Sequence, residues 1–263
     1  TLFPYTTLFR SHHLEFFSYN YQIRQICPII WYNVWDATPS PDFNLPYYDS
    51  CDGILNISKL THDSVVSVLK DKVSSKVVKF VPHGVDLTKF YPITESHPEY
   101  DELIKFRTNI FGTNTTDTVF LFNSVNSRRK NIGSLIEAFV EALKTRSDIR
   151  LILHTQAQGD YQIPKIIDKL CSDAKVDFRG KIILTNTRLD DRQMLYLYNS
   201  CDYVVNFSYN EGWGLSLTEG MACGKPFIAP YHGGMKTQFD IVDNYTIKSG
   251  RPSYPIEISN MLD

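Results

Sequence analysis

The sequence lacks the marks of a metal-binding, membrane-spanning or nucleic-acid-binding protein. Its five cysteines are widely spaced, with no C-x-x-C pair and no Cys/His spacing typical of zinc sites. No apolar run reaches about 18 residues, so no transmembrane helix is predicted. The net charge is only −2, which does not favour binding to nucleic acid. We therefore expect buried, reduced thiols in a cytoplasmic protein that binds no nucleic acid.

The remaining composition is that of an ordinary globular protein. The chain has 263 residues, 43% hydrophobic and 21% charged, which suffices for two modest domains. Residues 1–11, T-L-F-P-Y-T-T-L-F-R-S, resemble the translation of a sequencing-library adapter. We interpret them as a non-native scar and exclude them from fold prediction. This interpretation implies a reading frame cut at its 5′ end, so the lack of a leader is uninformative.

Residues 12–95 show strands alternating with helices, a pattern that predicts a parallel sheet. Strands are predicted at 26–34, 54–58 and 77–81, and a helix at about 60–73. The apolar face of this helix is formed by Val65, Val66, Leu69 and Val73. A further helix at 100–111 lies within the linking stretch 96–111.

A second α/β series runs from about residue 112 to 250. Strands are predicted at 119–122, 150–154, 181–185, 203–208 and 226–230, with helices at about 132–144, 163–171, 190–201 and from 215 to a C-cap near 224. The expected apolar faces of the last two helices comprise Met194, Leu195, Leu197, Tyr198, Leu215, Leu217, Met221 and Ala222. Such alternation predicts a doubly wound sheet that binds its ligand at the carboxyl ends of the strands.

The stretch 210–234 has the most informative pattern: a short strand, a glycine-rich loop, a helix and a second strand. Glycines beside a helix N-terminus allow phosphate to approach free backbone N–H groups. Glu211 and Glu219 are eight residues apart, about two helical turns. Because carboxylates repel phosphate, we expect them to contact neutral hydroxyls of a sugar or ribose. Together these features predict a nucleotide-sugar site.

The segment E-G-W-G-L-S-L-T-E, followed by G-M-A-C-G-K-P, resembles the E-x7-E signature of retaining glycosyltransferases of group 1, or family 4. These enzymes have the GT-B fold, with two Rossmann-like domains. The resemblance implies that Glu211 is catalytic and approaches the donor sugar, while Glu219 holds the ribose. It also implies a set of donor-binding residues around the diphosphate, Gly212, Trp213, Gly214 and Leu215. The alternative is an ordinary strand–loop–helix with two solvated acids.

A basic cluster, S-R-R-K-N at 127–131, follows the first strand of the second series. Cations there can neutralise the charge that develops on a diphosphate leaving group. The resemblance implies a catalytic role for Lys130, with Arg129 beside it as a donor-binding residue. The family often has a Gly-Arg pair some five residues before the lysine, where this chain has Ser124-Val125, so Arg128 or Arg129 would have to substitute. The alternative is a solvated basic turn.

Three further residues and one glycine pair are weaker candidates. The resemblance places Arg188 and Leu189 beside the nucleobase, although they also fit a plain loop before a helix. Asp36 follows a predicted strand, where relatives carry an acceptor-side His or Asp, but it equally fits a turn before prolines. The pair Gly233-Gly234 corresponds to a similar pair near the donor sugar.

The resemblance implies an α/β protein of the GT-B fold with two Rossmann-like domains, the N-terminal one truncated. The expected parts are a partial acceptor domain (12–95), a linker helix (96–111), a donor domain (112–250) and a truncated tail (251–263). The expected reaction moves a sugar from a nucleoside diphosphate sugar to an acceptor hydroxyl, with retention and without metal or cofactor.

Donor base, sugar and acceptor are not readable from the sequence. The acceptor is a glycan, a lipid or a protein, and any peripheral membrane contact would come through the missing N-terminal part. Two alternatives stay open, a nucleotide-binding fragment without transfer activity and a nucleotide-sugar epimerase of the same fold. A phosphorylase is less favoured, since no pyridoxal-binding lysine signature occurs.

Overall fold

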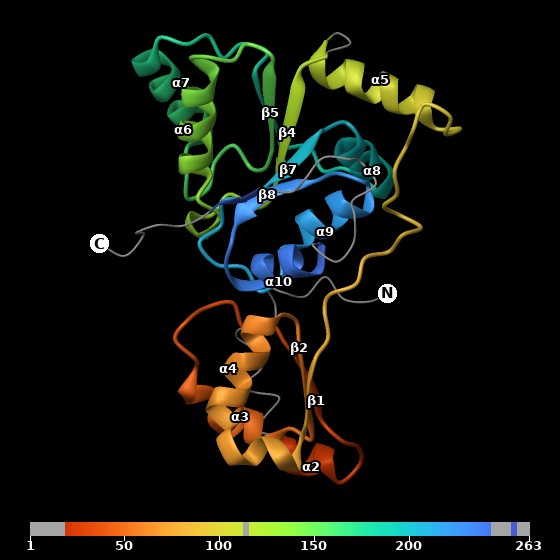
Figure 1. Cartoon of the computed structure of the whole chain (residues 1–263), viewed down its shortest axis with the longest axis vertical. Helices are drawn as coiled ribbons and strands as arrows, with labels where there is room; N and C mark the ends of the chain where they lie inside the picture. The colour runs from red at the N-terminus through yellow and green to blue at the C-terminus, as the bar shows by residue number, and fades with distance from the viewer. Residues whose placement is uncertain (1–18, 113–115, 243–253, 257–263) are drawn as a thin grey trace. The chain divides into compact units, whose positions relative to one another are not determined.

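The computed structural model describes residues 19–112, 116–242 and 254–256 (Figure 1). The adapter-like residues 1–11 and most of the predicted tail lie outside the described residues, as does the predicted end of the donor domain at 250. The chain forms two compact units. The first extends to His83 and includes two later segments, Glu211–Trp213 and His232–Thr237. The second holds the rest, beginning at Gly84.

The first unit is built on a three-stranded parallel sheet in the order β1 (Ile30–Asn33), β2 (Gly53–Asn56) and β3 (Val77–Phe80). Its helices are α2 (Asn20–Arg24), α3 (Leu45–Ser50) and α4 (Lys59–Leu69), with 3-10 turns at Asp42–Asn44 and Lys70–Ser75. The α4 helix begins after Ser58, whose side chain accepts a hydrogen bond from the Thr61 amide. The buried core comprises Ile29, Tyr48, Cys51, Ile54, Val65, Val68 and Leu69.

Two predicted boundaries in this unit are wrong. Ile26, predicted to begin a buried strand, is 86% exposed and follows α2, and the strand starts only at Ile30. The predicted helix to Val73 ends at Leu69, because Lys70 adopts a left-handed φ of 51°. Its buried face also includes Val68, which the predicted face omitted.

The second unit contains a six-stranded parallel sheet in the order β6-β5-β4-β7-β8-β9. Its strands are β4 (Thr118–Asn123), β5 (Ile149–His154), β6 (Ile182–Thr185), β7 (Tyr203–Val205), β8 (Phe227–Pro230) and β9 (Tyr254–Ile256). The described pairings are all parallel, so the predicted α/β, Rossmann-like architecture is confirmed. The strand β9 was not predicted; it falls in the expected tail and pairs with β8.

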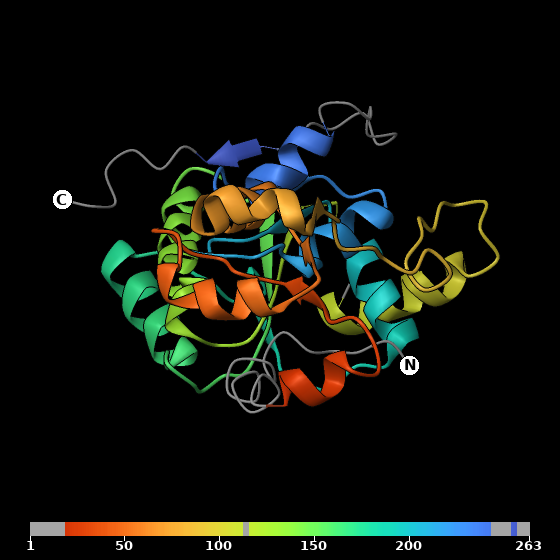
Figure 2. The ribbon, with the colours of Figure 1, turned by 90° about the horizontal axis from the view of Figure 1, so that it is seen from below.

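The helices of this unit are α5 (Tyr100–Phe111), α6 (Ile132–Leu143), α7 (Ile163–Ala174), α8 (Asp191–Asn199) and α9 (Leu215–Ala222). A further helix, α10 (Gly233–Val242), contributes residues to both units. The helices α6 and α7 lie on one side of β4 and β5, and α8 lies on the other (Figures 1 and 2). None of the helices in the described residues is long and apolar enough to span a membrane.

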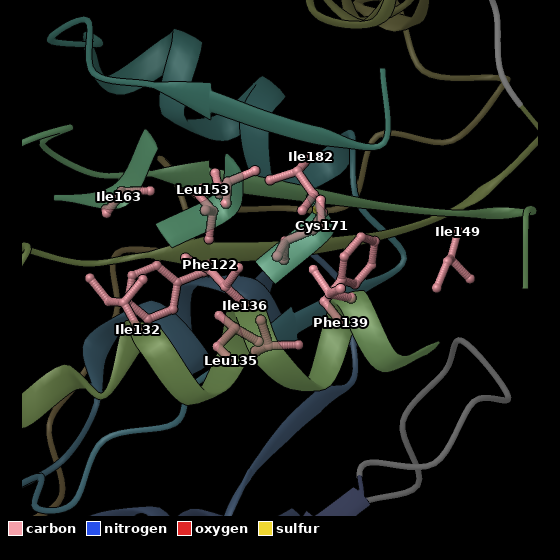
Figure 3. Close-up of a cluster of buried hydrophobic side chains, with 14 residues drawn as sticks. Phe122, Ile132, Leu135, Ile136, Phe139, Ile149, Leu153, Ile163, Cys171 and Ile182 are labelled. Carbon is pink, nitrogen blue, oxygen red and sulfur yellow. The ribbon is translucent and has the colours of Figure 1, made fainter. Parts of the chain in front are cut away.

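Apolar side chains fix α6 and α7 against the sheet. Phe122 and Leu153 from the strands pack with Ile136 and Phe139 of α6 and with Ile163 of α7 (Figure 3). The loops that follow β4 and β5 are thereby placed together at the carboxyl end of the sheet.

On the α9 side, Gly220 brings its helix close to β7. A Cβ atom added at Gly220 would lie only 2.4 Å from the Val204 Cγ2 atom.

Candidate functional site

The centre of the six-stranded sheet is a topological switch point. The strands β4 and β7 are neighbours, and the chain leaves β4 toward β5 but leaves β7 toward β8. In doubly wound sheets, ligands bind at the carboxyl ends of strands where connections diverge in this way. The two loops concerned are residues 124–131 after β4 and residues 206–214 after β7. Three residues of the second loop, Glu211–Trp213, belong to the first unit.

The basic loop after β4 carries Lys130 in a 3-10 turn, Arg128–Lys130, that leads into α6. Arg128 is exposed and Arg129 half-buried, whereas Lys130 is only 9% exposed. The Arg129 Nη1 atom donates a hydrogen bond to the Asn210 carbonyl at 2.5 Å, and the Tyr209 amide donates to the Arg129 carbonyl at 2.9 Å. The loop therefore contacts the β7 loop directly before Glu211, and the buried Lys130 does not fit a solvated turn.

Asn126 fixes the basic loop to the β5–α7 loop. Its Nδ2 donates to the Gln156 and Tyr161 carbonyls at 3.0 and 2.8 Å, and its Oδ1 accepts from the Tyr161 amide at 3.1 Å. Gly159 permits this approach, since a Cβ there would lie 2.7 Å from the Asn126 carbonyl oxygen. These contacts hold the start of the loop that presents Lys130.

The substitution Asn126→Ala is expected to lower the free energy of unfolding by about 2–4 kcal/mol, because it leaves three partly buried backbone groups of Gln156 and Tyr161 without partners. Urea denaturation measures this loss, and hydrogen exchange should show reduced protection of the Tyr161 amide. Gln158→Ala, at an exposed position of the partner loop, is the control and should change stability by less than about 0.5 kcal/mol. Equal losses of stability in the two variants would contradict the inference that Asn126 holds the basic loop to the β5–α7 loop.

The carboxyl group of Glu219 lies on α9 near the end of β4. The Tyr198 hydroxyl donates to Glu219 Oε2 at 2.5 Å, and Asn123 Nδ2 donates to the Tyr198 oxygen at 2.9 Å. Burial raises the pKa of Glu219, while the hydrogen bond from Tyr198 lowers it. Burial also raises the pKa of Tyr198 well above 10, and the nearby Glu219 charge adds to that effect. The phenol is therefore a neutral donor to the carboxylate.

The helix α9 begins after Gly214, which has a φ of 95°. Gly214 is the N-cap residue and has no side chain, so no side-chain cap accepts from the amides of the first turn. Uncapped amides at a helix N-terminus are a common binding site for anions. Gln238 steadies this start by donating from Nε2 to the Gly214 carbonyl at 3.3 Å. Leu215, predicted to face the core, is instead 37% exposed, and it is the first residue of α9.

The first unit holds the remaining part of the predicted loop. Glu211 and Trp213 are 6% and 5% exposed, which argues against a solvated acid at position 211. The Gly234 amide donates to the Glu211 carbonyl at 2.9 Å, and a Cβ at Gly234 would lie 2.1 Å from the Gly212 oxygen. A Cβ at Gly212 would in turn lie 2.8 Å from the Val34 carbonyl oxygen. The glycines at these positions thus allow close backbone packing.

Among the weaker candidates, Arg188, Leu189 and Asp36 take no part in the hydrogen bonds described above. Arg188 is exposed and Leu189 half-buried in the loop before α8, which is closed by a capping box between Asp190 and Gln193. Asp36 lies after β1 in the first unit and is half-buried.

Sequence reasoning missed three residues that support the candidate site. Asn123 and Asn126 were counted only as loop residues, and Tyr198 was assigned to an apolar helix face. Of these three, only Asn123 has a sequence signal, which is a polar side chain at the end of a buried strand. The contacts of all three are with residues distant in sequence, which no local pattern reveals.

The comparisons with known proteins agree with this geometry. Residues 104–248, more than half of the chain, match the model of the family "Glycosyl transferases group 1". The alpha-monoglucosyldiacylglycerol synthase of Streptococcus pneumoniae is 28% identical over 183 residues, which cover 69% of this chain and 37% of that protein. The chain thus spans less than half the length of this curated relative.

Two solved structures show the same fold. A glycosyltransferase of Rickettsia africae is 21% identical, with a TM-score of 0.65 over 86% of this chain and 55% of that one. The Anabaena protein HepE, solved with UDP and glucose, is 18% identical, with a TM-score of 0.61 over 80% of this chain and 54% of that one. At these identities the similarity shows the fold alone, and it confirms the predicted α/β architecture of GT-B glycosyltransferases.

Proposed function

The chain belongs to the family of glycosyl transferases group 1, and on this premise we propose that it transfers a sugar from a nucleoside diphosphate sugar to an acceptor hydroxyl. One observation carries the proposal. At the switch point of the second unit, Arg129 joins the basic loop to the residue directly before Glu211. The cationic side chain of Arg129 thus contacts Asn210, the residue before Glu211, at the place where a doubly wound sheet binds nucleotides.

Each proposed role follows from the chemistry of its group. The Lys130 ammonium stabilises the negative charge that develops on the diphosphate, together with the first amides of α9. The Glu219 carboxylate accepts hydrogen bonds from the ribose, and Glu211 positions the donor sugar. Because Arg129 already bonds the Asn210 carbonyl, we assign it to holding the loop as well as to the diphosphate. The exposed Arg128 is the other available cation.

Further parts of the proposal rest on the E-x7-E resemblance. They are retention of the anomeric configuration, independence of metal and cofactor, and a base site near Arg188 and Leu189 with Asp36 on the acceptor side. The free cysteines support a cytoplasmic location. The name of the pneumococcal relative makes a diacylglycerol-based lipid the first acceptor to test.

Thermal unfolding with UDP, GDP, ADP and their sugars, in the presence of EDTA, tests the donor site. A ligand at 100 times its Kd adds about 2.7 kcal/mol if it binds only the folded state. We expect the nucleotides of one base to raise the Tm of the wild type but not of Glu219→Ala. A cooperative transition that no nucleotide shifts would contradict the proposed function.

A transfer assay with the selected donor then separates the open alternatives. Release of nucleoside diphosphate that depends on an acceptor supports transfer. Binding without release supports a nucleotide-binding chain, and a new epimer with no released nucleotide supports an epimerase.

A further inference from the structure

Three residues of the second unit form a chain of hydrogen bonds that ends on Glu219. They come from three separate elements: Asn123 from the end of β4, Tyr198 from α8 and Glu219 from α9. Tyr198 is among the largest fully buried side chains, with 0% exposure. Phe90 packs edge-on against the Tyr198 ring, with centroids 5.7 Å apart and an interplanar angle of 82°. The ring is therefore held in one orientation.

The direction of these hydrogen bonds is fixed by their chemistry. An amide nitrogen can only donate, so the Tyr198 oxygen must accept from Asn123 Nδ2. The phenol has a single hydrogen, and this hydrogen points to Glu219 Oε2. Asn123 thus sets the direction in which Tyr198 donates.

The second carboxylate oxygen of Glu219 is left for a ligand. Within the described part of the chain, Oε1 accepts no hydrogen bond, and it is not among the buried polar atoms that lack partners. Glu219 itself is only half-buried. A carboxylate with one oxygen fixed and the other reaching solvent is preorganised to accept from a hydroxyl group.

We propose that Tyr198, oriented by Asn123, is a positioning residue that fixes the Glu219 carboxylate so that Oε1 accepts from the ribose hydroxyls of the donor. This inference rests on the proposed function and adds to it the groups that determine the geometry of ribose recognition. Tyr198 itself does not contact the substrate.

The titration of Glu219 gives a signature that a merely structural role would not produce. Among the described residues, the titratable groups that interact with it are Tyr198 from α8 and Cys223, which directly follows α9. Burial raises the pKa of the Cys223 thiol to about 12. Both are neutral near pH 7, so Glu219 is the member of this group that titrates on the acid side. The hydrogen bond from Tyr198 lowers the Glu219 pKa, and its loss should raise that pKa further. The acid limb of nucleotide binding should then move to higher pH.

The test compares Tyr198→Phe with Tyr196→Phe, which removes a hydroxyl from the same helix, where it accepts from Arg192 Nε at 2.8 Å. Calorimetry from pH 5 to 8 measures the Kd of UDP, GDP or ADP, whichever the wild type binds. The 2′,3′-dideoxy form of the same nucleotide is the second ligand. Carbon-13 NMR of labelled glutamate, assigned with Glu219→Gln, measures the Glu219 pKa in the free protein.

We expect Tyr198→Phe to weaken binding of the ribonucleotide about tenfold at pH 7 and to raise the Glu219 pKa, with neither change in Tyr196→Phe. The dideoxy nucleotide should bind Tyr198→Phe and the wild type equally, because it lacks the hydroxyls that Glu219 accepts from. Asn123→Ala, which keeps the phenol, should shift both quantities in the same direction by a smaller amount. If Tyr198→Phe does not fold, Asn123→Ala provides the test in its place.

An unchanged Glu219 pKa, or an equal loss of affinity for both nucleotides, would overturn the inference. If the Glu219 pKa rises as expected but the wild type binds no nucleotide, the hydrogen bond between Tyr198 and Glu219 is confirmed. The proposed function is then wrong, and so is the proposed role of Glu219 in binding ribose. The two failures are therefore distinguishable.

Discussion

Replacing Lys130 with methionine should weaken nucleoside diphosphate binding by about 10- to 100-fold and leave binding of the matching nucleoside unchanged. The reason is that Lys130 is 9% exposed in a loop beside the switch point, where a charge-assisted hydrogen bond to phosphate is little screened by solvent. Methionine keeps most of the apolar stem of lysine, so packing of the loop is retained. Calorimetry with the diphosphate and the nucleoside measures the difference.

Arg128→Met is the matched control for this experiment. It removes a cation two residues earlier in the same turn, but from an exposed position, where a charge contributes less. We expect its effect on diphosphate binding to stay below about threefold. Equal losses in the two variants, or a loss of nucleoside affinity in Lys130→Met, would show that Lys130 does not act on the diphosphate.

The substitution Gly234→Ala should have the largest effect on the first unit, a loss of about 2–4 kcal/mol in the free energy of unfolding. The added Cβ would lie 2.1 Å from the Gly212 oxygen and 2.6 Å from the Trp213 Cα. Both are backbone atoms, so no side-chain rotation can relieve the overlap. The loop that carries Glu211 or the start of α10 must move, and donor binding should weaken with it. Urea denaturation and nucleotide titration measure the two effects.

Gly84→Ala provides the control. Apart from Gly84 itself and its two chain neighbours, no heavy atom lies within 4 Å of the position its Cβ would take, and its φ is outside the left-handed range. We expect this variant to match the wild type or to be stabilised by up to about 1 kcal/mol, because alanine restricts the unfolded chain. If both glycine variants behave alike, close packing against the Glu211 loop does not constrain position 234.

Periodic patterns predicted the second unit well. The helix at 100–111 has the predicted ends, since Gly112 takes a left-handed φ of 73° and stops it. Local patterns failed where the backbone departs from residue preference, as at the left-handed Lys70. They also missed β9, which has only three residues, one of them Pro255, and too short a run to show alternation.

The candidate site was predictable in its residue types but not in its supporting contacts. Glycines and acids at fixed spacing indicated the loop at 210–219, and the basic cluster indicated Lys130. The partners of these residues depend on strand order. Asn123 and Tyr198 are 75 residues apart, and they meet only because β4 lies in the sheet beside β7, the strand that follows α8. In the sequence, Tyr198 fits the apolar face of a helix. No neighbouring residue in the sequence indicates that its hydroxyl donates to Glu219.

The strand order also determines when during folding the site can form. One edge of β4 pairs with β5 soon after synthesis, but its other edge has no partner until Tyr203 and Val204 are available. The bond between Arg129 and Asn210 closes a separation of 81 residues. Such long-range pairing is slow, and an open strand edge is exposed to aggregation in the meantime. Completion of the sheet centre therefore comes late, and a ligand that binds at the switch point would favour the completed sheet over partly folded forms.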